Sequence, residues 1–333
     1  MGGELERDLW DLADLVTPMA VRVAATLRIA DHMAQGLQTA PELAQASKAN
    51  ADALDRVLRH LAKAGLLNRD ESGAYSLTAR GEGLRSDHPS RWRAMLDIES
   101  AIGRADLSFI QLLHSVRTGE AAFPLVFGRP FWDDLSADPA RSASYDAQMG
   151  SDVAADAHAI ASAYDWGSLG HVVDVGGGNG ALLIAILREH PALRGTDFDQ
   201  PATAETARQA LLAAGLAYRS EVVSGSFFDP LPPGAGGYVL SAIIHDWDDT
   251  AARAILRRCA EAAGATAPVL VVEKIGADGE SLRTGMDLRM LAYFGGKERG
   301  VAELAVLAGS AGLRVAAVHP AGPLAIVELR SQT

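Results

Sequence analysis

The spacing of hydrophobic residues changes near residue 165 of the 333-residue chain. Before this point apolar residues recur every three or four positions. In "LADLVTPMAVRVAATLRIADHM" this spacing predicts one amphipathic helix. After it, short apolar runs such as "HVVDVGGG" and "APVLVVEKI" alternate with helical stretches at 180–190, 201–214 and 250–263. Strands that alternate with helices indicate parallel βαβ units. We therefore expect a helical N-terminal half and an α/β C-terminal half.

Two short helices and a small hairpin are predicted in the N-terminal half. Thr39 can cap the first helix, and Asn50 or Asp52 can cap the second. The second helix should end at Gly65, and "LLNRDESGAYSLT" predicts the hairpin. This order is typical of a winged helix-turn-helix. DNA binding would need a basic surface, yet residues 37–85 hold seven Lys or Arg against six Asp or Glu.

The remaining segments complete the predicted fold. Residues 92–164 should continue as helices around a loop, "GEAAFPLVFGRPFWDDL". The tail "LRVAAVHPAGPLAIVELR" has two strand-like runs with no helix between them, which predicts an antiparallel hairpin that closes the sheet. We expect an N-terminal helical and winged-helix domain, a helical linker and pocket region, and a Rossmann-like α/β domain, over residues 1–90, 91–165 and 166–333.

Composition narrows the class of protein. The net charge of -12 argues against a surface built to bind nucleic acid. Cys259 is the only cysteine, so no intramolecular disulfide can form, which fits a reducing cytoplasm. The start "MGGELERDLWDLAD" is acidic and lacks the apolar core of a signal peptide, and no apolar run reaches about 18 residues. We expect a cytoplasmic protein that does not enter a membrane.

The glycine-rich stretch "VVDVGGGNGALL" predicts a strand, a tight turn and a helix start that can approach a nucleotide-like ligand. Gly176, Gly178 and Ala181 also match the dinucleotide fingerprint, so the motif alone leaves the ligand open. Asp199 lies 21 residues beyond Gly178, where a carboxylate can accept ribose hydroxyls. Asp174 precedes the turn and can face a cationic group. A plain structural turn, and a helix cap at Asp199, are the alternatives.

A polar cluster ends the apolar run in "SAIIHDWDDT", residues 241–250. His245 is either a catalytic base or a loop residue at the start of the helix near Asp249. A neutral imidazole can take a proton from a phenol of pKa about 10, and a neighbouring carboxylate would fix its tautomer. Glu273 ends an apolar strand, where an unpaired carboxylate is costly. The other histidines lack the spacing of metal ligands, so no metal site is expected.

Several motifs in order carry a resemblance to a known family: "DVGGGNG", "FDQP", "GSFFDPLP", "HDWDD", "DLRMLAYFGGKER" and the closing hairpin. Over nearly its whole length the chain resembles the S-adenosylmethionine-dependent small-molecule O-methyltransferases of bacterial secondary metabolism, relatives of the plant caffeate-type enzymes. It looks closest to the branch that acts on aromatic polyketide acids such as naphthoates and orsellinates. The resemblance implies a C-terminal methyltransferase domain and an N-terminal domain that forms a homodimer. It also implies methylation of a phenolic hydroxyl, with S-adenosylhomocysteine as the second product.

The resemblance also implies roles for individual residues. His245 would be the general base, with Glu273 and Glu298 orienting it. The expected donor contacts are Asp174, Gly176, Gly178, Asp199, Gly225, Ser226, Phe227, Ser241 and Trp247. The expected acceptor contacts are Trp132, Met149, Met290, Tyr293 and Phe294. A substrate carboxylate would need an arginine, for which the candidates are Arg22, Arg104 and Arg289.

Two positions depart from the family pattern. Ser226 stands where an aspartate usually accepts from the adenine amino group, and Ser241 stands where plant members carry lysine. Both departures concern donor affinity more than reaction type. Three other classes stay open: a relative that keeps the cofactor but decarboxylates or hydroxylates, a ligand-sensing regulator with a winged helix, and a nicotinamide oxidoreductase that rests on glycine spacing alone. His245, Glu273 and Glu298 argue against the first of these.

Overall fold

The computed structural model describes residues 9–10, 12–275 and 284–332. The chain divides into two compact units, Met1–Leu107 and Ser108–Thr333. The three-part division expected from the sequence stays a prediction, and so does the lack of a signal peptide, because residues 1–8 and 11 lie outside the described residues. In the part of the chain that the structure describes, no helix combines the length and apolar character needed to cross a membrane.

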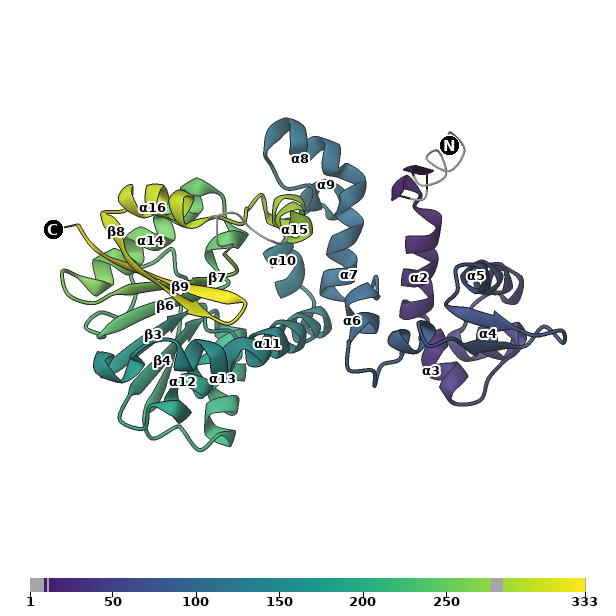
Figure 1. Cartoon of the computed structure of the whole chain (residues 1–333), viewed down its shortest axis with the longest axis horizontal. Coiled ribbons are helices and arrows are strands. Elements are labelled where there is room, and N and C mark those ends of the chain that lie inside the picture. The colour runs from purple at the N-terminus through teal and green to yellow at the C-terminus, as the bar shows by residue number, and fades with distance from the viewer. Residues whose placement is uncertain (1–8, 11, 276–283, 333) are drawn as a thin grey trace. The chain divides into compact units, whose positions relative to one another are not determined.

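The first unit is a small helical domain with a two-stranded wing (Figure 1). Its elements are α2 (Val16–Thr26), α3 (Ile29–Ala34), α4 (Ala40–Ser47), α5 (Ala51–Lys63), β1 (Leu67–Arg69), β2 (Tyr75–Leu77), η1 (Gly81–Leu84), α6 (Trp92–Leu96) and α7 (Ala101–Asp106). The single helix expected in "LADLVTPMAVRVAATLRIADHM" is wrong. Arg28 has a φ of 54°, a left-handed conformation that cannot continue a right-handed helix, so α2 and α3 are separate.

Local capping and strand pairing agree with the sequence pattern in this unit. The Thr39 N–H donates to Glu42 Oε2 at 2.9 Å, where α4 begins. Asn50, and not Asp52, caps α5, because its Oδ1 accepts from the Ala53 N–H at 3.0 Å. The wing forms as expected, with β1 antiparallel to β2. The predicted winged-helix arrangement is therefore present.

The second unit begins with short helices before its sheet. They are η2 (Leu107–Gln111), α8 (Leu112–Thr118), α9 (Phe123–Phe127), α10 (Phe131–Ser136), α11 (Pro139–Ser162) and η3 (Trp166–Leu169). The loop expected at 119–135 is wrong, because it contains α9 and α10. Phe123 and Phe131 are buried with their ring centroids 5.4 Å apart, and this burial holds both short helices in place.

A seven-stranded sheet in the order β5-β4-β3-β6-β7-β9-β8 forms the centre of the second unit. Its strands are β3 (His171–Val175), β4 (Arg194–Asp199), β5 (Ser220–Ser224), β6 (Gly237–Ser241), β7 (Val269–Glu273), β8 (Leu313–Ala321) and β9 (Leu324–Ser331). The first five are parallel, whereas β9 is antiparallel to both β7 and β8. The predicted α/β fold with a closing antiparallel hairpin is confirmed.

Helices cover both faces of this sheet (Figure 1). One face packs against α11, α12 (Ala181–Glu189) and α13 (Pro201–Ala213), and the other against α14 (Asp249–Ala263) and α16 (Val301–Gly309). The chain leaves β3 toward β4 on one side, and β6 lies on the other. In parallel sheets such a reversal of strand order opens a ligand crevice at the carboxyl ends of the strands. The glycine turn, Ser241 and Glu273 all lie at that edge.

Candidate active site

The backbone of the turn after β3 favours glycine. Gly176 and Gly178 have φ values of 75° and 64°, in the left-handed region. A Cβ on Gly176 would also lie 2.5 Å from Ile243 Cδ1. Asp199, at the end of β4, accepts the Gly178 N–H at 2.9 Å through Oδ2. The structure therefore brings the predicted glycines and the predicted ribose carboxylate into direct contact.

Aromatic side chains border the same turn. Phe227 would lie 3.7 Å from a Cβ on Gly176, and its ring meets Trp247 edge to face at 5.7 Å. Gly225 donates its N–H to Asp199 O at 2.9 Å, which joins this segment to the end of β4. The Ser226 hydroxyl accepts the Phe228 N–H at 3.3 Å. The structure thus places the predicted adenine-side residues together.

The end of β6 delivers the next group of residues. Ser241 is the last residue of β6 and pairs in register with Val272, the residue before Glu273. Ala242 follows with a φ of 54°, a conformation that L residues rarely adopt and that often marks functional sites. The chain then enters the short turn η4 (Ile244–Asp246), which carries His245. The left-handed residue therefore turns the chain from the strand to the predicted base.

Three carboxylates surround the His245 ring. Nδ1 lies 3.0 Å from Glu273 Oε2 and 3.6 Å from Glu298 Oε1, and Nε2 lies 3.4 Å from Asp246 Oδ1. Glu273 Oε1 also accepts the backbone N–H groups of Ile244 and His245, at 3.1 and 3.3 Å. The His245 side chain is 20% exposed, so the ring is accessible from one side. The structure brings the predicted trio together and adds Asp246, which the sequence analysis did not assign a role.

The carboxylates around His245 shift the pKa of the imidazole and of Asp246. Burial lowers the pKa of His245, but Glu273, Asp246 and the hydrogen bonds to Glu273 and Glu298 raise it, and the resulting pKa lies well above the usual value. Burial raises the pKa of Asp246 to about 7; His245 lowers that pKa, whereas Glu273 and Glu298 raise it. The surrounding carboxylates therefore favour the imidazolium form of the ring, and His245 acts as a base only in its neutral form.

Arg299 holds the turn that carries His245, and the sequence analysis missed it. Its buried guanidinium donates to Ile244 O at 2.9 Å, to Trp247 O at 2.8 Å and to Asp249 Oδ1 at 2.8 Å. A Cβ on Gly296 would lie 2.2 Å from His245 O, so the segment "GGKER" packs directly on this turn. One sign of Arg299 was available in the sequence, namely that it is a charged residue directly after Glu298.

An aromatic cluster gathers three of the five predicted acceptor contacts, and a fourth lies on one of the helices that form it. Trp132 of α10 stacks on Phe294 of α15 (Thr284–Phe294) at 5.3 Å and 12°. Phe131 stacks on Tyr293 at 6.3 Å and 9°, and Phe131 and Trp132 both meet Tyr145 of α11 edge to face. Met290 also lies on α15, where it is buried. Phe131 and Tyr145 are members of the cluster that the sequence analysis missed.

The cluster adjoins the His245 group through Tyr145. Burial, followed by the charges of Asp246, Asp146 and Asp199, raises the pKa of Tyr145 well above the usual value. Asp246 follows His245 and Asp199 touches the glycine turn, so Tyr145 is influenced by charges from both halves of the site. Met149, the fifth predicted acceptor contact, is half-buried one helical turn beyond Tyr145, on the same face of α11.

The three arginines that are candidates for binding a substrate carboxylate do not all lie in the same unit. Arg22 and Arg104 lie in the first unit, on α2 and α7, and Arg22 forms an ion pair with Asp106. Arg289 lies on α15 in the second unit, on the helix that carries Tyr293 and Phe294. Among the described residues, no group of three or more His, Cys, Asp or Glu side chains is placed to hold a metal ion.

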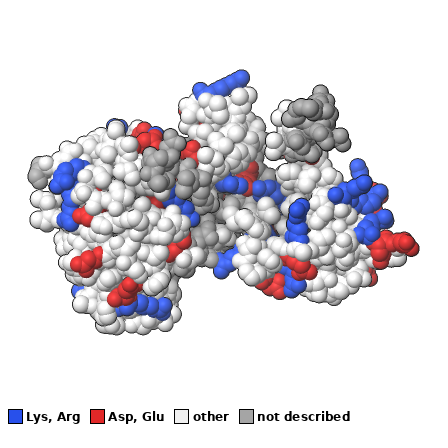
Figure 2. Space-filling view, viewed as in Figure 1, with Lys and Arg blue, Asp and Glu red and all other residues white. Residues whose placement is uncertain are grey.

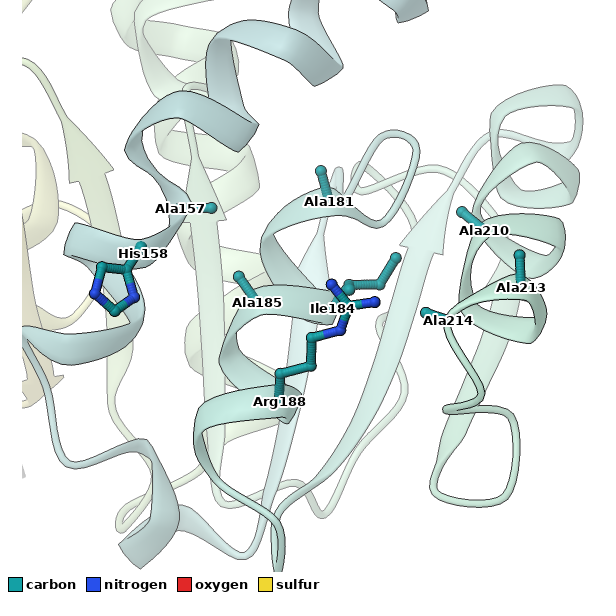
Figure 3. Close-up of a pocket in the computed structure, with 9 residues that line it drawn as sticks. All are labelled: Ala157, His158, Ala181, Ile184, Ala185, Arg188, Ala210, Ala213 and Ala214. Carbon is teal, nitrogen blue, oxygen red and sulfur yellow. The ribbon is translucent and has the colours of Figure 1, made fainter.

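A separate groove between α11, α12 and α13 contains none of the predicted site residues (Figure 3). It is lined by Ala157, His158, Ala181, Ile184, Ala185, Arg188, Ala210, Ala213 and Ala214. Arg188 extends from α12 across the groove toward α13 (Figure 3). Because alanines make up most of its lining and none of the predicted site residues lies there, the candidate site is the edge of the sheet at His245.

Comparison with known proteins agrees with this geometry. Residues 109–314 match the O-methyltransferase domain, and residues 10–86 match the O-methyltransferase dimerisation domain. The chain therefore belongs to the S-adenosylmethionine-dependent O-methyltransferases, as the sequence motifs predicted.

Individual relatives cover nearly the full chain. A 2,7-dihydroxy-5-methyl-1-naphthoate 7-O-methyltransferase from Streptomyces carzinostaticus is 58% identical and covers 96% of both chains. The structure of the O-methyltransferase NcsB1 from neocarzinostatin biosynthesis, in complex with S-adenosylmethionine and 2-hydroxy-5-methyl naphthoic acid, has a TM-score of 0.93 at 57% identity and covers 97% of this chain and 98% of that one. The aclacinomycin 10-hydroxylase RdmB from Streptomyces purpurascens is 43% identical over 96% of this chain and 87% of its own length.

Proposed function

We propose that this enzyme methylates a phenolic hydroxyl of a hydroxylated naphthoic acid, with His245 as the general base. The observation that carries the proposal is the His245–Glu273–Glu298 group, which adjoins an aromatic cluster at the carboxyl edge of the sheet. A relative at 58% identity is a naphthoate O-methyltransferase, which supports the acceptor class. A flat bicyclic acid also suits the stacked rings of Trp132 and Phe294.

The proposed mechanism of the base follows from the two ring nitrogens of the imidazole. Glu273 lies at Nδ1 and fixes the proton there, which leaves the Nε2 lone pair to accept the proton of the acceptor hydroxyl. Glu273 and Glu298 then stabilise the imidazolium that forms. The donor supplies an electrophilic methyl group on a sulfonium when it is bound. Because such transfer is an in-line displacement, the chain contributes mainly alignment and a deprotonated nucleophile.

The glycine turn fits a donor of this chemistry. Asp199 sits against Gly178 with its carboxylate at the end of β4, where it would accept ribose hydroxyls. Phe227 and Trp247 would border the adenine, and Gly176 allows a close approach of the backbone. Asp174 has a buried Oδ2 with no hydrogen-bond partner, which suits a cationic ligand. Gly225, Ser226 and Ser241 would complete the donor contacts.

The acceptor would lie against α10, α11 and α15. We assign its ring contacts to Trp132, Met149, Met290, Tyr293 and Phe294. Trp132 Nε1 is buried without a hydrogen-bond partner in the described residues, so its N–H can donate to an acceptor oxygen. Methionine and aromatic side chains together adapt to a planar ring.

We also propose a cytoplasmic homodimer that forms through the N-terminal unit. Residues 10–86 match a dimerisation domain, and Trp10, Leu12 and Leu15 are 71%, 85% and 66% exposed in the single chain. Apolar side chains exposed in this number mark an interaction surface. The DNA-binding alternative has little support, because Lys, Arg, Asp and Glu are interspersed over the visible face of this unit (Figure 2).

The competing activity is hydroxylation, because one relative at 43% identity is a hydroxylase. The decisive experiment incubates the protein with S-adenosylmethionine and 2,7-dihydroxy-5-methyl-1-naphthoate and analyses products by mass spectrometry. We expect a methyl ether and an equal amount of S-adenosylhomocysteine. An oxygenated or decarboxylated product without S-adenosylhomocysteine would overturn the proposal. Calorimetry with S-adenosylhomocysteine and, in parallel, with NADH shows whether the site binds the methyl-donor cofactor or a nicotinamide cofactor.

A further inference from the structure

Two buried aspartates lie side by side beneath the glycine turn. Asp174 of β3 and Asp197 of β4 are paired in the parallel register, so both side chains project from the same face of the sheet. Asp174 is 1% exposed and Asp197 is 0% exposed. Among the described residues, both oxygens of Asp197 and Oδ2 of Asp174 lack a hydrogen-bond partner. Buried carboxyl groups without partners are costly, so this pair requires a charge-neutralising occupant.

The pair lies directly against the glycine turn of the predicted donor site. A Cβ on Gly177 would lie 2.3 Å from Asp197 Oδ2 and 3.1 Å from Asp174 Cγ. A Cβ on Gly180, where α12 begins, would lie 3.7 Å from the same Asp197 oxygen. Asp197 therefore touches the turn on the side opposite to open solvent, next to the Gly178 N–H that Asp199 accepts.

The charges around the pair are negative. Burial, then the charge of Asp199, raises the pKa of Asp174 to about 7. Burial, then the charges of Asp174 and Asp199, raises the pKa of Asp197 to about 9. From α11, Asp146 interacts with Asp199 and adds a further negative charge.

Among the described residues, α12 and α13 bring no compensating cation to this face. Their contacts with it are apolar, through residues such as Leu183 of α12 and Ala207 of α13. The charged side chains of α12 and α13 are exposed: Arg188, Glu189, Glu205 and Arg208. The neutralising charge must therefore be a proton or a bound ligand.

We propose that the Asp174–Asp197 pair holds a proton on one of its carboxyl groups in the free enzyme and releases it when the cationic methyl donor binds at the glycine turn. The inference rests on the proposed donor site and deepens it, because it assigns Asp197 to donor recognition. A positive group near the pair favours the ionised carboxylates, so ligand and proton compete for the same site. Both S-adenosylmethionine and its product carry an ammonium group, so the product is a suitable probe.

The test is calorimetric and needs no turnover. S-adenosylhomocysteine is titrated near pH 8, between the two pKa values of about 7 and about 9, in two buffers of different ionisation enthalpy. We expect the wild type to release roughly one proton per ligand bound, and affinity to rise with pH by at most roughly tenfold per unit. Asp197→Asn keeps the side-chain shape but cannot ionise, so its proton release should fall well below that of the wild type. The exposed Asp165→Asn is the matched control and should behave like the wild type.

Two results would overturn the linkage. One is binding heat that does not depend on the buffer in the wild type, and the other is equal proton release from the wild type and Asp197→Asn. If Asp197→Asn does not fold, the test rests on the wild type: an affinity that stays constant from about pH 7 to about pH 9 refutes the release of a proton from the pair. Failure of S-adenosylhomocysteine to bind the wild type in either buffer is a different outcome, because it removes the donor site and the proposed function with it.

Discussion

Glu273 holds His245 through both its backbone and its ring. One carboxylate oxygen accepts the His245 N–H at 3.3 Å, and the other lies 3.0 Å from Nδ1. The carboxylate itself is buried at the end of β7, the strand next to the one that leads into His245. The orientation of the proposed base is therefore set by a residue at the end of a central strand of the sheet.

Removing the imidazole should abolish most of the activity without disturbing the donor site. For His245→Ala we expect kcat to fall at least about a hundredfold, because a positioned base contributes about 10²–10⁴-fold. The affinity for S-adenosylhomocysteine should stay near that of the wild type in calorimetry. His158→Ala is the control, because the His158 side chain is 90% exposed on α11. A variant that keeps most of its turnover would show that His245 is not the base.

The pH dependence of Glu273→Gln tests the role of the carboxylate. His245 must be neutral to act, so its raised pKa places the rising limb of the kcat/KM profile above the ordinary imidazole value of about 6.5. Loss of the Glu273 charge lowers that pKa, so the limb should move to lower pH while kcat falls at least about tenfold. The exposed Glu221→Gln should leave the profile unchanged. An unmoved limb in Glu273→Gln would assign the titration to another group.

Arg299 should contribute to both stability and rate. In Arg299→Met the carbonyls of Ile244 and Trp247 lose a buried charged donor, and we expect the free energy of unfolding to fall by about 2–5 kcal/mol in urea titrations. In the folded fraction kcat should fall while the KM for the donor changes little, because His245 loses its fixed turn. Arg257→Met is the control on an exposed position of α14. Unchanged stability and kcat would show that the turn holds without the arginine.

Trp132 should determine how tightly the acceptor binds. We expect Trp132→Ala to raise the acceptor KM by roughly two- to tenfold, since an aromatic contact is worth about 0.5–1.5 kcal/mol. Trp132→Phe keeps the stack on Phe294 but removes the indole N–H, so it separates ring packing from hydrogen bonding. Steady-state kinetics with donor in excess provides the measurement. If the KM of neither variant changes, the acceptor lies elsewhere.

The exposed apolar residues near the N-terminus should stabilise the dimer. Trp10→Glu introduces a charge on a surface where Trp10 is 71% exposed in the single chain, and we expect a shift toward monomer in sedimentation velocity. Leu212→Glu, at a position of α13 that is 61% exposed, is the control and should sediment like the wild type. Identical sedimentation of all three proteins would place the interface elsewhere.

The sequence by itself determined the features that depend on local spacing. Alternating apolar runs indicated the parallel strands, the glycines indicated the turn after β3, and the tail indicated the antiparallel hairpin. The family resemblance carried by the motifs also indicated His245, Glu273 and Glu298. Local spacing did not predict the break between α2 and α3 at Arg28. It also did not predict the two helices within residues 119–135. Long-range packing decided both features.

Only the tertiary structure decided which distant residues meet. Asp174 and Asp197 are neighbours because β3 and β4 pair in one register, and a shift by one residue would place them on opposite faces. Arg299 reaches the turn of His245 because Gly296 lets its segment pack there. Trp132, Tyr145 and Phe294 form one cluster from three helices that are separate in sequence. Spacing along a chain cannot specify such contacts, because they depend on how whole elements dock against the sheet.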